Sequence, residues 1–304
     1  MVDSFLKKIK SLINSSVKND LMGINRKIKE EILINNYSNS VLNSNEIGIS
    51  DEKYTQTNII ISLTSYSKRV NNVYLTIESL FNQTLKPNKI ILNLNSPWNE
   101  NNIPETLKKQ RLRGLEINFV EDFKSYDKLI HTLKTNPDDT IITCDDDVMY
   151  PFDFVEKFIL NHIEDPNTIL FYRGHLIKFY KDDIICPYNK WGIDEAKSFN
   201  NILNFPNGNC GILYPKNSLN DNVFDSKKFM KLAPNGDDIW FKAMSVLENT
   251  PVKKIELETH PFNKMIAIGV SQEIALWMNN INNSENDIQI KNVFEEFDII
   301  KYLK

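Results

Sequence analysis

The stretch from Thr140 to Asp147 constrains this chain more than any other, because a β-branched apolar run ends there in three consecutive carboxylates. Ile and Thr favour the pleated, covered surface of a strand. Adjacent acids are not buried without partners, since each unpaired buried charge costs several kcal/mol. We therefore expect Asp145, Asp146 and Asp147 at the carboxyl end of a buried strand, where open α/β sheets bind ligands.

The chemistry of three clustered acids favours a metal site. Carboxylates are hard oxygen ligands that suit Mg²⁺ or Mn²⁺, and such ions usually arrive with substrate phosphates. A solvated acidic turn after a strand would also account for the three acids. The stretch by itself leaves both interpretations open.

Apolar runs and helical patterns alternate from residue 58 to about residue 150. The runs that read as strands are residues 58–63, 89–94, 115–120 and 140–144, and the helical patterns between them are residues 70–82, 107–112 and 126–133. This alternation predicts right-handed βαβ units and a mostly parallel central sheet flanked by helices, an α/β fold.

Beyond the acids the predicted elements are shorter, and residues 177–180 are among the expected strands. The sequence predicts a catalytic domain over residues 55–265 and a helical tail over residues 266–304 packed on it. One helix of the tail is expected around Ile274, Leu276 and Trp277, and another around Val293, Phe294 and Phe297.

Residues 1–34 form an amphipathic helical pattern. Its apolar positions recur at helical spacing with lysines between them, namely Phe5, Leu6, Ile9, Leu12, Ile13 and Val17. Such a helix packs on its own domain or on a partner subunit, or it rests on anionic lipid as a peripheral contact. The Asn- and Ser-rich residues 35–57 read as a linker, so residues 1–54 are predicted to be a helical extension with a polar linker.

Composition and charge exclude several classes of protein. The net charge of -4 provides no general attraction to nucleic acid. The sequence has no apolar run long enough to span a membrane and no apolar signal-peptide core. Cys144, Cys186 and Cys210 are far apart and match no disulfide framework or metal motif, so we expect reduced thiols and a cytoplasmic protein, peripheral at the inner face of the membrane if the first helix binds lipid.

Three more polar features accompany the acids. The run Thr64–Arg69 follows the first strand and offers hydroxyls, amides and a guanidinium for phosphates, although its Ser and Thr residues also suit helix caps. Gly208–Gly211 allows a ligand close to the backbone, or it only shapes a turn. Asp237 and Asp238 begin a helix, whose dipole keeps a carboxylate ionised, or they only cap it.

The order of these features resembles the GT-A glycosyltransferases, and most of all the bacterial family 2-type enzymes that build surface polysaccharides. The resemblance covers roughly residues 58–262. Its motifs are the first strand with its loop (residues 59–66), a first helix with S-L-x-x-Q-T (residues 79–84), a DxD motif (residues 145–147), a glycine-rich acceptor loop (residues 208–211) and an acidic pair (residues 236–240).

The resemblance implies a metal-dependent, inverting transfer of a sugar from a nucleotide sugar, expected to be a UDP-sugar, to a hydroxyl of a glycan or lipid-linked saccharide. It assigns Mn²⁺ or Mg²⁺ to Asp147, Asp145 and His260, with Asp145 also facing the donor. Asp238 is the expected base and Asp237 the expected helix cap. The residues expected to bind the donor and its metal complex are Thr64, Ser65, Tyr66, Arg69, Lys128, Asp145, Asp146, Gly208 and Gly211.

The sequence also departs from this family. Asn93 and Asn95 stand where an acidic residue usually follows the second strand, which leaves base recognition open. Two other functions are considered. One is a sugar-nucleotide nucleotidyltransferase, but the absence of glycine from Thr64–Arg69 argues against it. The other is an inactive glycan-binding module, which would bind its ligand without metal. Fold resemblance alone does not separate these alternatives.

Overall fold

The computed structural model describes residues 2–181, 184–269 and 285–304, with side chains described from residue 23 onward. The chain divides into two compact units, Met1–Ser44 and Asn45–Lys304. The helix predicted around Ile274, Leu276 and Trp277 lies outside the described residues, as do the side chains of the apolar stripe predicted near the N-terminus.

The first unit is a single helix, α1 (Val2–Asn43). The prediction that this helix ends near residue 34 was wrong. Asn and Ser are weak helix formers but do not break a helix, and no Gly or Pro occurs between Gly23 and Gly48. Ile24, Ile28 and Ile32 are each 53% exposed and recur every fourth residue, so they share one face. Among the described residues, no helix combines the length and the apolar character needed to cross a membrane.

The second unit begins with a segment that is hydrogen-bonded into the domain. The Gly48 amide donates to the carbonyl of Arg113, and the Ser50 amide donates to the carbonyl of Pro87, each at 2.9 Å. A Cβ at Gly48 would overlap the Phe81 ring, so this position requires a glycine. The predicted linker over residues 35–57 is therefore helix in its first part and ordered domain structure from Gly48.

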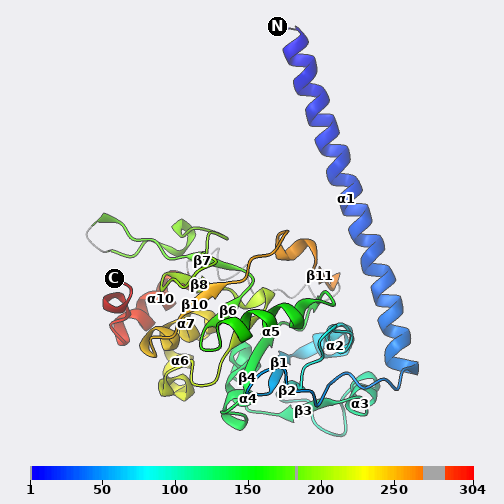
Figure 1. Ribbon diagram of the computed structural model, residues 1–304, viewed down its shortest axis with the longest axis vertical. Coiled ribbons are helices and arrows are strands. Elements are labelled where there is room, and N and C mark those ends of the chain that lie inside the picture. Colours follow the sequence, from blue (N-terminus) through cyan, green and yellow to red (C-terminus); the bar gives the residue numbers. More distant parts are fainter. Residues whose placement is uncertain (1, 182–183, 270–284) are drawn as a thin grey trace. The chain divides into compact units, whose positions relative to one another are not determined.

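A seven-stranded sheet forms the centre of the second unit (Figure 1). In spatial order its strands are β10 (Val252–Lys254), β6 (Ile169–Phe171), β9 (Ile212–Tyr214), β4 (Thr140–Cys144), β1 (Ile59–Ser65), β2 (Lys89–Leu94) and β3 (Leu115–Phe119). Strand β9 is antiparallel to both of its neighbours, and the other neighbouring pairs are parallel. This confirms the predicted α/β fold with a mostly parallel sheet.

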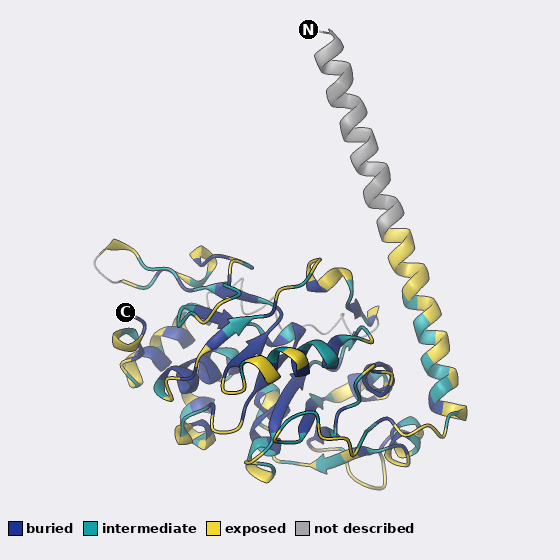
Figure 2. Cartoon of the chain, viewed as in Figure 1, coloured by how far each residue is buried: buried dark blue, intermediate teal, exposed yellow. Residues whose placement is uncertain are grey.

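Alternating side chains of the strands divide the core into two layers. Ile59, Ile61 and Leu63 pack on one face of the sheet, whereas Ile60 packs on the other. The first face is covered by α2 (Val73–Phe81), α3 (Glu105–Arg111) and α5 (Phe154–Glu164). The second is covered by α4 (Ile130–Thr135), α6 (Ser226–Leu232), α7 (Asp237–Leu247) and α10 (Glu285–Glu296). The central strands β1, β4, β6 and β9 are buried between these helices, whereas the edge strand β3 is partly exposed (Figure 2).

Two short antiparallel pairs lie outside the main sheet. Strand β5 (Val148–Met149) pairs with β11 (Ile266–Ala267), and β7 (Gly174–Leu176) pairs with β8 (Asn204–Pro206). The strand predicted at residues 177–180 was therefore placed too late in the chain. Gly174 lies against the Phe205 carbonyl and the Phe171 ring. Because a side chain would not fit there, the strand pair begins at a glycine.

The strand directions place several loops at one edge of the sheet. Because β9 is antiparallel to β4 and to β6, the carboxyl ends of β1, β4, β6 and β10 and the amino end of β9 all lie at that edge. The three acids follow β4 there, and the predicted glycine loop precedes β9. The topology therefore brings together segments that are far apart in the sequence.

Candidate active site

Asp146 is held by the chain itself. Its carboxylate accepts a hydrogen bond of 2.5 Å from the Ser65 hydroxyl and lies 3.3 Å from Nη1 of Arg69, and its backbone carbonyl accepts from the Thr76 hydroxyl at 2.9 Å. It is only 5% exposed, and burial raises its pKa. Asp146 thus fastens the acidic turn to the end of β1 and to α2.

Asp147 and Asp145 are carboxylates whose negative charges repel each other. Arg69 also pairs through Nη2 with Asp147, whose side chain is 13% exposed. Burial raises the pKa of Asp147 to about 7, and the nearby negative charge of Asp145 raises it as well, while Arg69 acts against both. The two carboxylates repel each other, with Arg69 beside Asp147 and Lys128 beside Asp145. Such a site would be stabilised by a further cation.

The residues present suit a divalent ion with two protein ligands. Mg²⁺ and Mn²⁺ take carboxylate oxygens and complete their coordination with water and substrate phosphates, so Asp145 and Asp147 are a sufficient protein set. His260 is not brought to them. Its Nε2 lies 3.3 Å from Asp194, and its Nδ1 accepts from the amide of Phe262 at 3.3 Å. Within the described ranges, no three His, Cys, Asp or Glu side chains are grouped to hold a metal ion.

Lys128 connects the acidic turn with the acidic pair. Its Nζ lies 3.3 Å from Oδ1 of Asp145 and 3.1 Å from Oδ2 of Asp237. Burial alone would lower the pKa of Lys128, but Asp237 and Asp145 raise it well above its ordinary value. The ammonium is therefore charged, and it lies where the two predicted halves of the site meet.

The position of Lys128 depends on Asp127, which sequence reasoning missed. The fully buried Asp127 carboxylate accepts from the amide of Phe123 and pairs with His131, both at 3.0 Å. Asn95, at the end of β2, donates to its other oxygen at 3.4 Å. These contacts hold the 3-10 turn Lys124–Lys128 against the sheet edge. An isolated acid in a helical pattern carries no signal for such a role.

Helix α7 begins at Asp237, and its N-cap residue is Gly236, so the prediction that Asp237 caps the helix was wrong. Asp237 is drawn away from the helix end because its carboxylate accepts from the Ser125 hydroxyl at 2.8 Å and pairs with Lys128. Its neighbour Asp238 accepts from the Gly208 amide at 3.0 and 3.2 Å. The acidic pair is thus turned toward the sheet edge.

The environment of Asp238 tunes its protonation. Burial raises the pKa of Asp238 to about 7, and the charge of Asp237 adds to this, whereas Lys128 and the Gly208 amide oppose it. A carboxyl group with a pKa near neutrality is suited to accept a proton from a substrate hydroxyl at physiological pH.

The two glycines of the predicted loop serve different purposes. A Cβ at Gly208 would lie 2.9 Å from Nζ of Lys128 and 3.0 Å from Oδ1 of Asp238, so this glycine lets the backbone approach both groups. Gly211 has φ +92°, and a Cβ there would lie 2.7 Å from the Phe154 ring. Gly208 therefore belongs to the site, whereas Gly211 shapes the entry into β9.

The predicted donor loop after β1 is partly engaged within the protein. The Thr64 hydroxyl donates to the carbonyl of Asn93 at 2.9 Å, and the Ser65 hydroxyl is bonded to Asp146. The Arg69 guanidinium lies over the partly exposed Tyr66 ring, 5.4 Å from its centroid. Of the side chains of this loop that were predicted to bind a donor, Thr64 and Ser65 are thus engaged within the protein, whereas Tyr66 is partly exposed.

Polar side chains that were not predicted from the sequence lie beside the glycine loop, namely Asn207, Tyr188 and His175. The Asn207 side chain reaches the Tyr188 hydroxyl at 3.4 Å and the His175 ring at 3.5 Å. Burial raises the pKa of Tyr188 to about 12, and the charge of Asp238 contributes to this shift. These residues come from three separate segments, so no local motif could have indicated them.

Comparisons with known proteins found fold similarities only. No family model and no curated protein matches the sequence. Among solved structures, a mannosyltransferase from Pyrobaculum calidifontis in complex with GDP-Man and Mn²⁺ is 11% identical, with a TM-score of 0.42 over 77% of this chain and 65% of that chain. S. aureus TarS 1-349 in complex with UDP is 10% identical, with a TM-score of 0.45 over 67% of this chain and 59% of that one. This chain thus spans less than two thirds of the length of either.

Proposed function

We propose that this protein is a nucleotide-sugar-dependent glycosyltransferase of the GT-A fold that transfers a sugar to a hydroxyl acceptor with inversion. The observation that carries the proposal is the arrangement around Lys128. This ammonium contacts both Asp145 and Asp237. Asp145 is close in the chain to Asp147, which is also a predicted metal ligand, and Asp237 directly precedes the predicted base Asp238. A leaving-group site and a proton acceptor therefore lie next to each other at one edge of the sheet.

The residues on the β4 side suit the leaving nucleotide. Asp145 and Asp147 would hold Mn²⁺ or Mg²⁺, which when bound neutralises charge on the departing diphosphate. Lys128 and Arg69 are the cations of the site, and both are paired with carboxylates that the diphosphate oxygens would partly replace. Tyr66 offers a partly exposed ring beside Arg69 for the nucleotide.

The residues on the β9 side suit the acceptor. Asp238 takes the proton of the acceptor hydroxyl as that oxygen attacks the anomeric carbon, whose transition state resembles an oxocarbenium ion. Gly208 fixes the orientation of the Asp238 carboxylate through its amide. Asp237 is engaged by Ser125 and Lys128, which leaves Asp238 as the proposed base of the pair, the role expected in an inverting enzyme.

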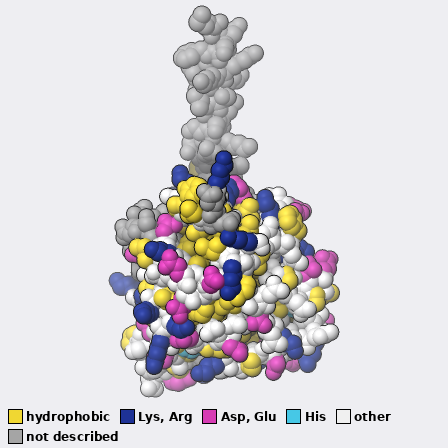
Figure 3. Space-filling model, turned by 90° about the vertical axis from the view of Figure 1, so that its left-hand side faces the viewer, with side chains coloured by type: hydrophobic (Ala, Val, Ile, Leu, Met, Phe, Trp, Pro, Cys, Tyr) yellow, Lys and Arg dark blue, Asp and Glu magenta, His cyan; other side chains and the backbone are white. Residues whose placement is uncertain are grey.

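The partners we propose are those that the sequence resemblance implies. The donor is a UDP-sugar and the acceptor a glycan or lipid-linked saccharide of a bacterial surface polysaccharide. Nucleic acid is not a partner. On the face drawn in Figure 3, Lys and Arg side chains are interspersed with Asp and Glu, which agrees with the net charge of -4. Residues 1–34 are proposed to contact a membrane surface or a second subunit. The protein is proposed to be cytoplasmic, and to lie at the inner face of the membrane if this segment binds lipid.

A screen of nucleotide sugars tests the function directly. The full-length protein is incubated with UDP-, GDP-, CMP- and dTDP-sugars, with Mn²⁺, Mg²⁺ or EDTA, and release of nucleotide is measured. We expect slow hydrolysis of one donor class that requires the metal ion and is lost in Asp147→Asn. Absence of both hydrolysis and calorimetric binding across the panel would refute the proposal.

A further inference from the structure

A second polar site lies at the same edge of the sheet, beyond the glycine loop. A cavity of about 120 Å³ is lined there by cationic and polar side chains, chiefly Arg173, Asp194, Lys254, Thr259 and His260. Arg173 follows the carboxyl end of β6, and Lys254 is the last residue of β10. The mechanism proposed above uses none of these residues.

The cavity carries an excess of positive charge. Nε of Arg173 pairs with Oδ1 of Asp194 at 2.7 Å, and the other oxygen of Asp194 contacts His260. The guanidinium lies over the Phe262 ring, 5.1 Å from its centroid, and Asp194 is its ion-pair partner among the described residues. Lys254 adds an ammonium that forms no ion pair within the described ranges of the chain. Two cations thus face one carboxylate in a protein of net charge -4.

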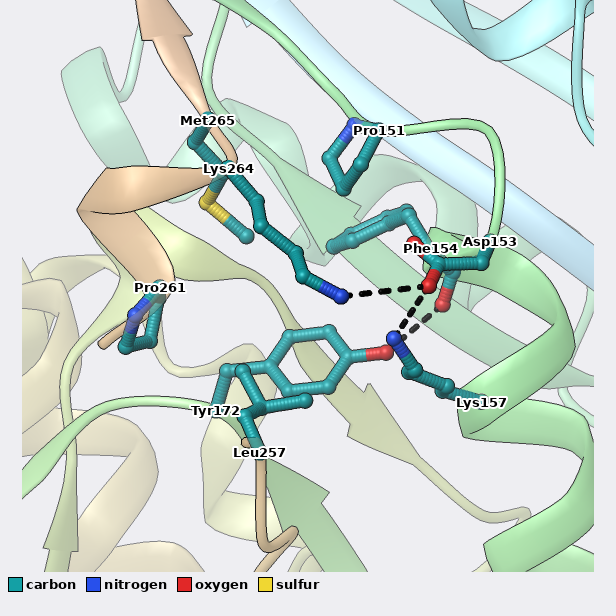
Figure 4. A pocket seen from close by; sticks show the side chains of 9 residues that line it. All are labelled: Pro151, Asp153, Phe154, Lys157, Tyr172, Leu257, Pro261, Lys264 and Met265. Carbon is teal, nitrogen blue, oxygen red and sulfur yellow. Dashed lines mark hydrogen bonds and ion pairs between the residues drawn. The ribbon is translucent and has the colours of Figure 1, made fainter. Parts of the chain in front are cut away.

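A neighbouring pair of lysines shows the contrast. A smaller cavity of about 10 Å³ shares Pro261 with the first, and both Lys157 and Lys264 point there to the carboxylate of Asp153 (Figure 4). It offers about the room of one water molecule, and both of its cations contact the same acid. Of these two cavities, the larger combines space for a ligand group with a lysine that forms no ion pair among the described residues.

The larger cavity lies within reach of the transfer site. Strands β6 and β10 are two and three positions from β4 in the sheet, which corresponds to about 10 and 14 Å at the usual spacing of strands. The amide of Asn207, directly before the glycine loop, donates to the carbonyl of Arg173 at 2.9 Å. The Tyr188 hydroxyl lies within electrostatic reach of Asp238 as well as of Arg173 and Asp194. The cavity therefore adjoins the acceptor side of the site.

We propose that this cavity is an acceptor subsite for an anionic group, a carboxylate or a phosphate ester, carried by the acceptor saccharide. The proposal rests on the proposed function for its role, since the cavity lies at the ends of strands two and three positions from β4, on the acceptor side of the proposed site. The planar fork of Arg173 and the ammonium of Lys254 would bind two oxygens of the anion, and Asp194 holds the fork in place. The acceptor is then an acidic saccharide rather than a neutral one.

The test measures binding of small probes to the full chain by ligand-observed NMR. Glucuronate and glucose 6-phosphate are compared with neutral glucose, and the two anions distinguish a carboxylate from a phosphate ester. We expect at least one anion to bind about tenfold more tightly than glucose, and Lys254→Gln and Arg173→Gln each to weaken that binding about fivefold or more. Lys253→Gln is the matched control, because Lys253 pairs with Asp165 at 2.6 Å and does not line the cavity.

The outcomes separate the subsite from the proposed function. Equal binding of all three probes, or equal loss in Lys253→Gln and Lys254→Gln, would overturn the subsite. Donor binding with Mn²⁺, measured by calorimetry, is expected to stay unchanged in Lys254→Gln. A protein that binds no nucleotide sugar but binds the anions through Lys254 would refute the glycosyltransferase and leave the anion site standing. The thermal midpoint of each variant verifies folding, and Lys254→Gln decides if Arg173→Gln does not fold.

Discussion

Replacement of Asp238 by Asn tests the central assignment of the site. The amide oxygen of Asn can still accept from the Gly208 amide, which Asp238 does at 3.0 Å, so the loop should keep its position. The Asn side chain at position 238, however, cannot accept a proton at neutral pH. We therefore expect turnover to fall by roughly 10²- to 10⁴-fold, with donor affinity almost unchanged, because the proton moves only in the transition state.

The pH dependence of the wild-type protein provides a second measure. With a pKa of about 7, the ionised fraction of Asp238 rises from about 0.09 at pH 6 to about 0.91 at pH 8, so turnover should rise roughly tenfold over this range. In Asp237→Asn the neighbouring negative charge that raises this pKa is gone, while Lys128 remains. The acid limb of the profile should then move to lower pH, with activity retained.

Stability should change in the opposite direction to activity. The pKa of Asp238 is higher in the folded state than its ordinary value of 3.8, so the folded state binds more protons, and this group disfavours folding increasingly as pH rises from about 4 to about 7. At pH 8 the penalty is at most about 4 kcal/mol at 1.36 kcal/mol per pKa unit. Asp238→Asn should therefore raise the thermal midpoint at pH 8 more than at pH 4.

A transfer assay with the identified donor, calorimetric donor titration and thermal unfolding together decide the question. Full turnover in Asp238→Asn would falsify its role as base. An acid limb that does not move in Asp237→Asn would show that the pair is not electrostatically coupled as the structure indicates. A lower thermal midpoint of Asp238→Asn at pH 8 would mean that its carboxylate is needed for packing rather than for chemistry.

Three other predictions concern separate parts of the molecule. Removal of residues 1–44 should leave a cooperatively unfolding domain that hydrolyses donor. Removal of residues 1–50 also takes the amides of Gly48 and Ser50, so its thermal midpoint should be lower than that of the first truncation. Equal midpoints of the two truncations in thermal denaturation would contradict this. Gly208→Ala should lower turnover with little loss of stability, because its Cβ meets the movable ends of the Lys128 and Asp238 side chains. Gly211→Ala, at φ +92°, should instead lower the free energy of unfolding by about 1–3 kcal/mol in urea denaturation. The reverse pattern would refute this division of roles between the two glycines. Asp147→Asn should abolish Mn²⁺-dependent donor binding in calorimetry with the fold intact by circular dichroism, and unchanged affinity would remove this residue from the metal site.

Sequence patterns predicted most of the framework, because the framework depends on local periodicity. The runs at residues 59–63 and 140–144 contain only apolar residues, Ser and Thr, as suits strands covered on both faces, and both are central strands of the sheet. Three acids directly after such a run must lie at the end of the strand. The edge on which the site is built could therefore be derived without coordinates.

Local patterns failed where neighbouring residues share one chemistry but have different partners. Asp145, Asp146 and Asp147 are identical in type, yet Asp146 bonds to Ser65 and Asp145 to Lys128. The roles of Asp237 and Asp238 were likewise expected from their order at the helix start. The cap is Gly236 instead, since Ser125, 112 residues away in the chain, holds Asp237.

Only the tertiary structure decided which charges meet. His260 follows a strand, as the resemblance required, but its ring contacts Asp194 because the turn Pro261–Asn263 directs it there. The antiparallel insertion of β9 between β4 and β6 places the glycine loop between the acidic turn and the Arg173 cavity. Strand order and direction are set by packing across the whole domain, so sequence periodicity determined the elements and the edge of the site, and the sheet topology determined its chemistry.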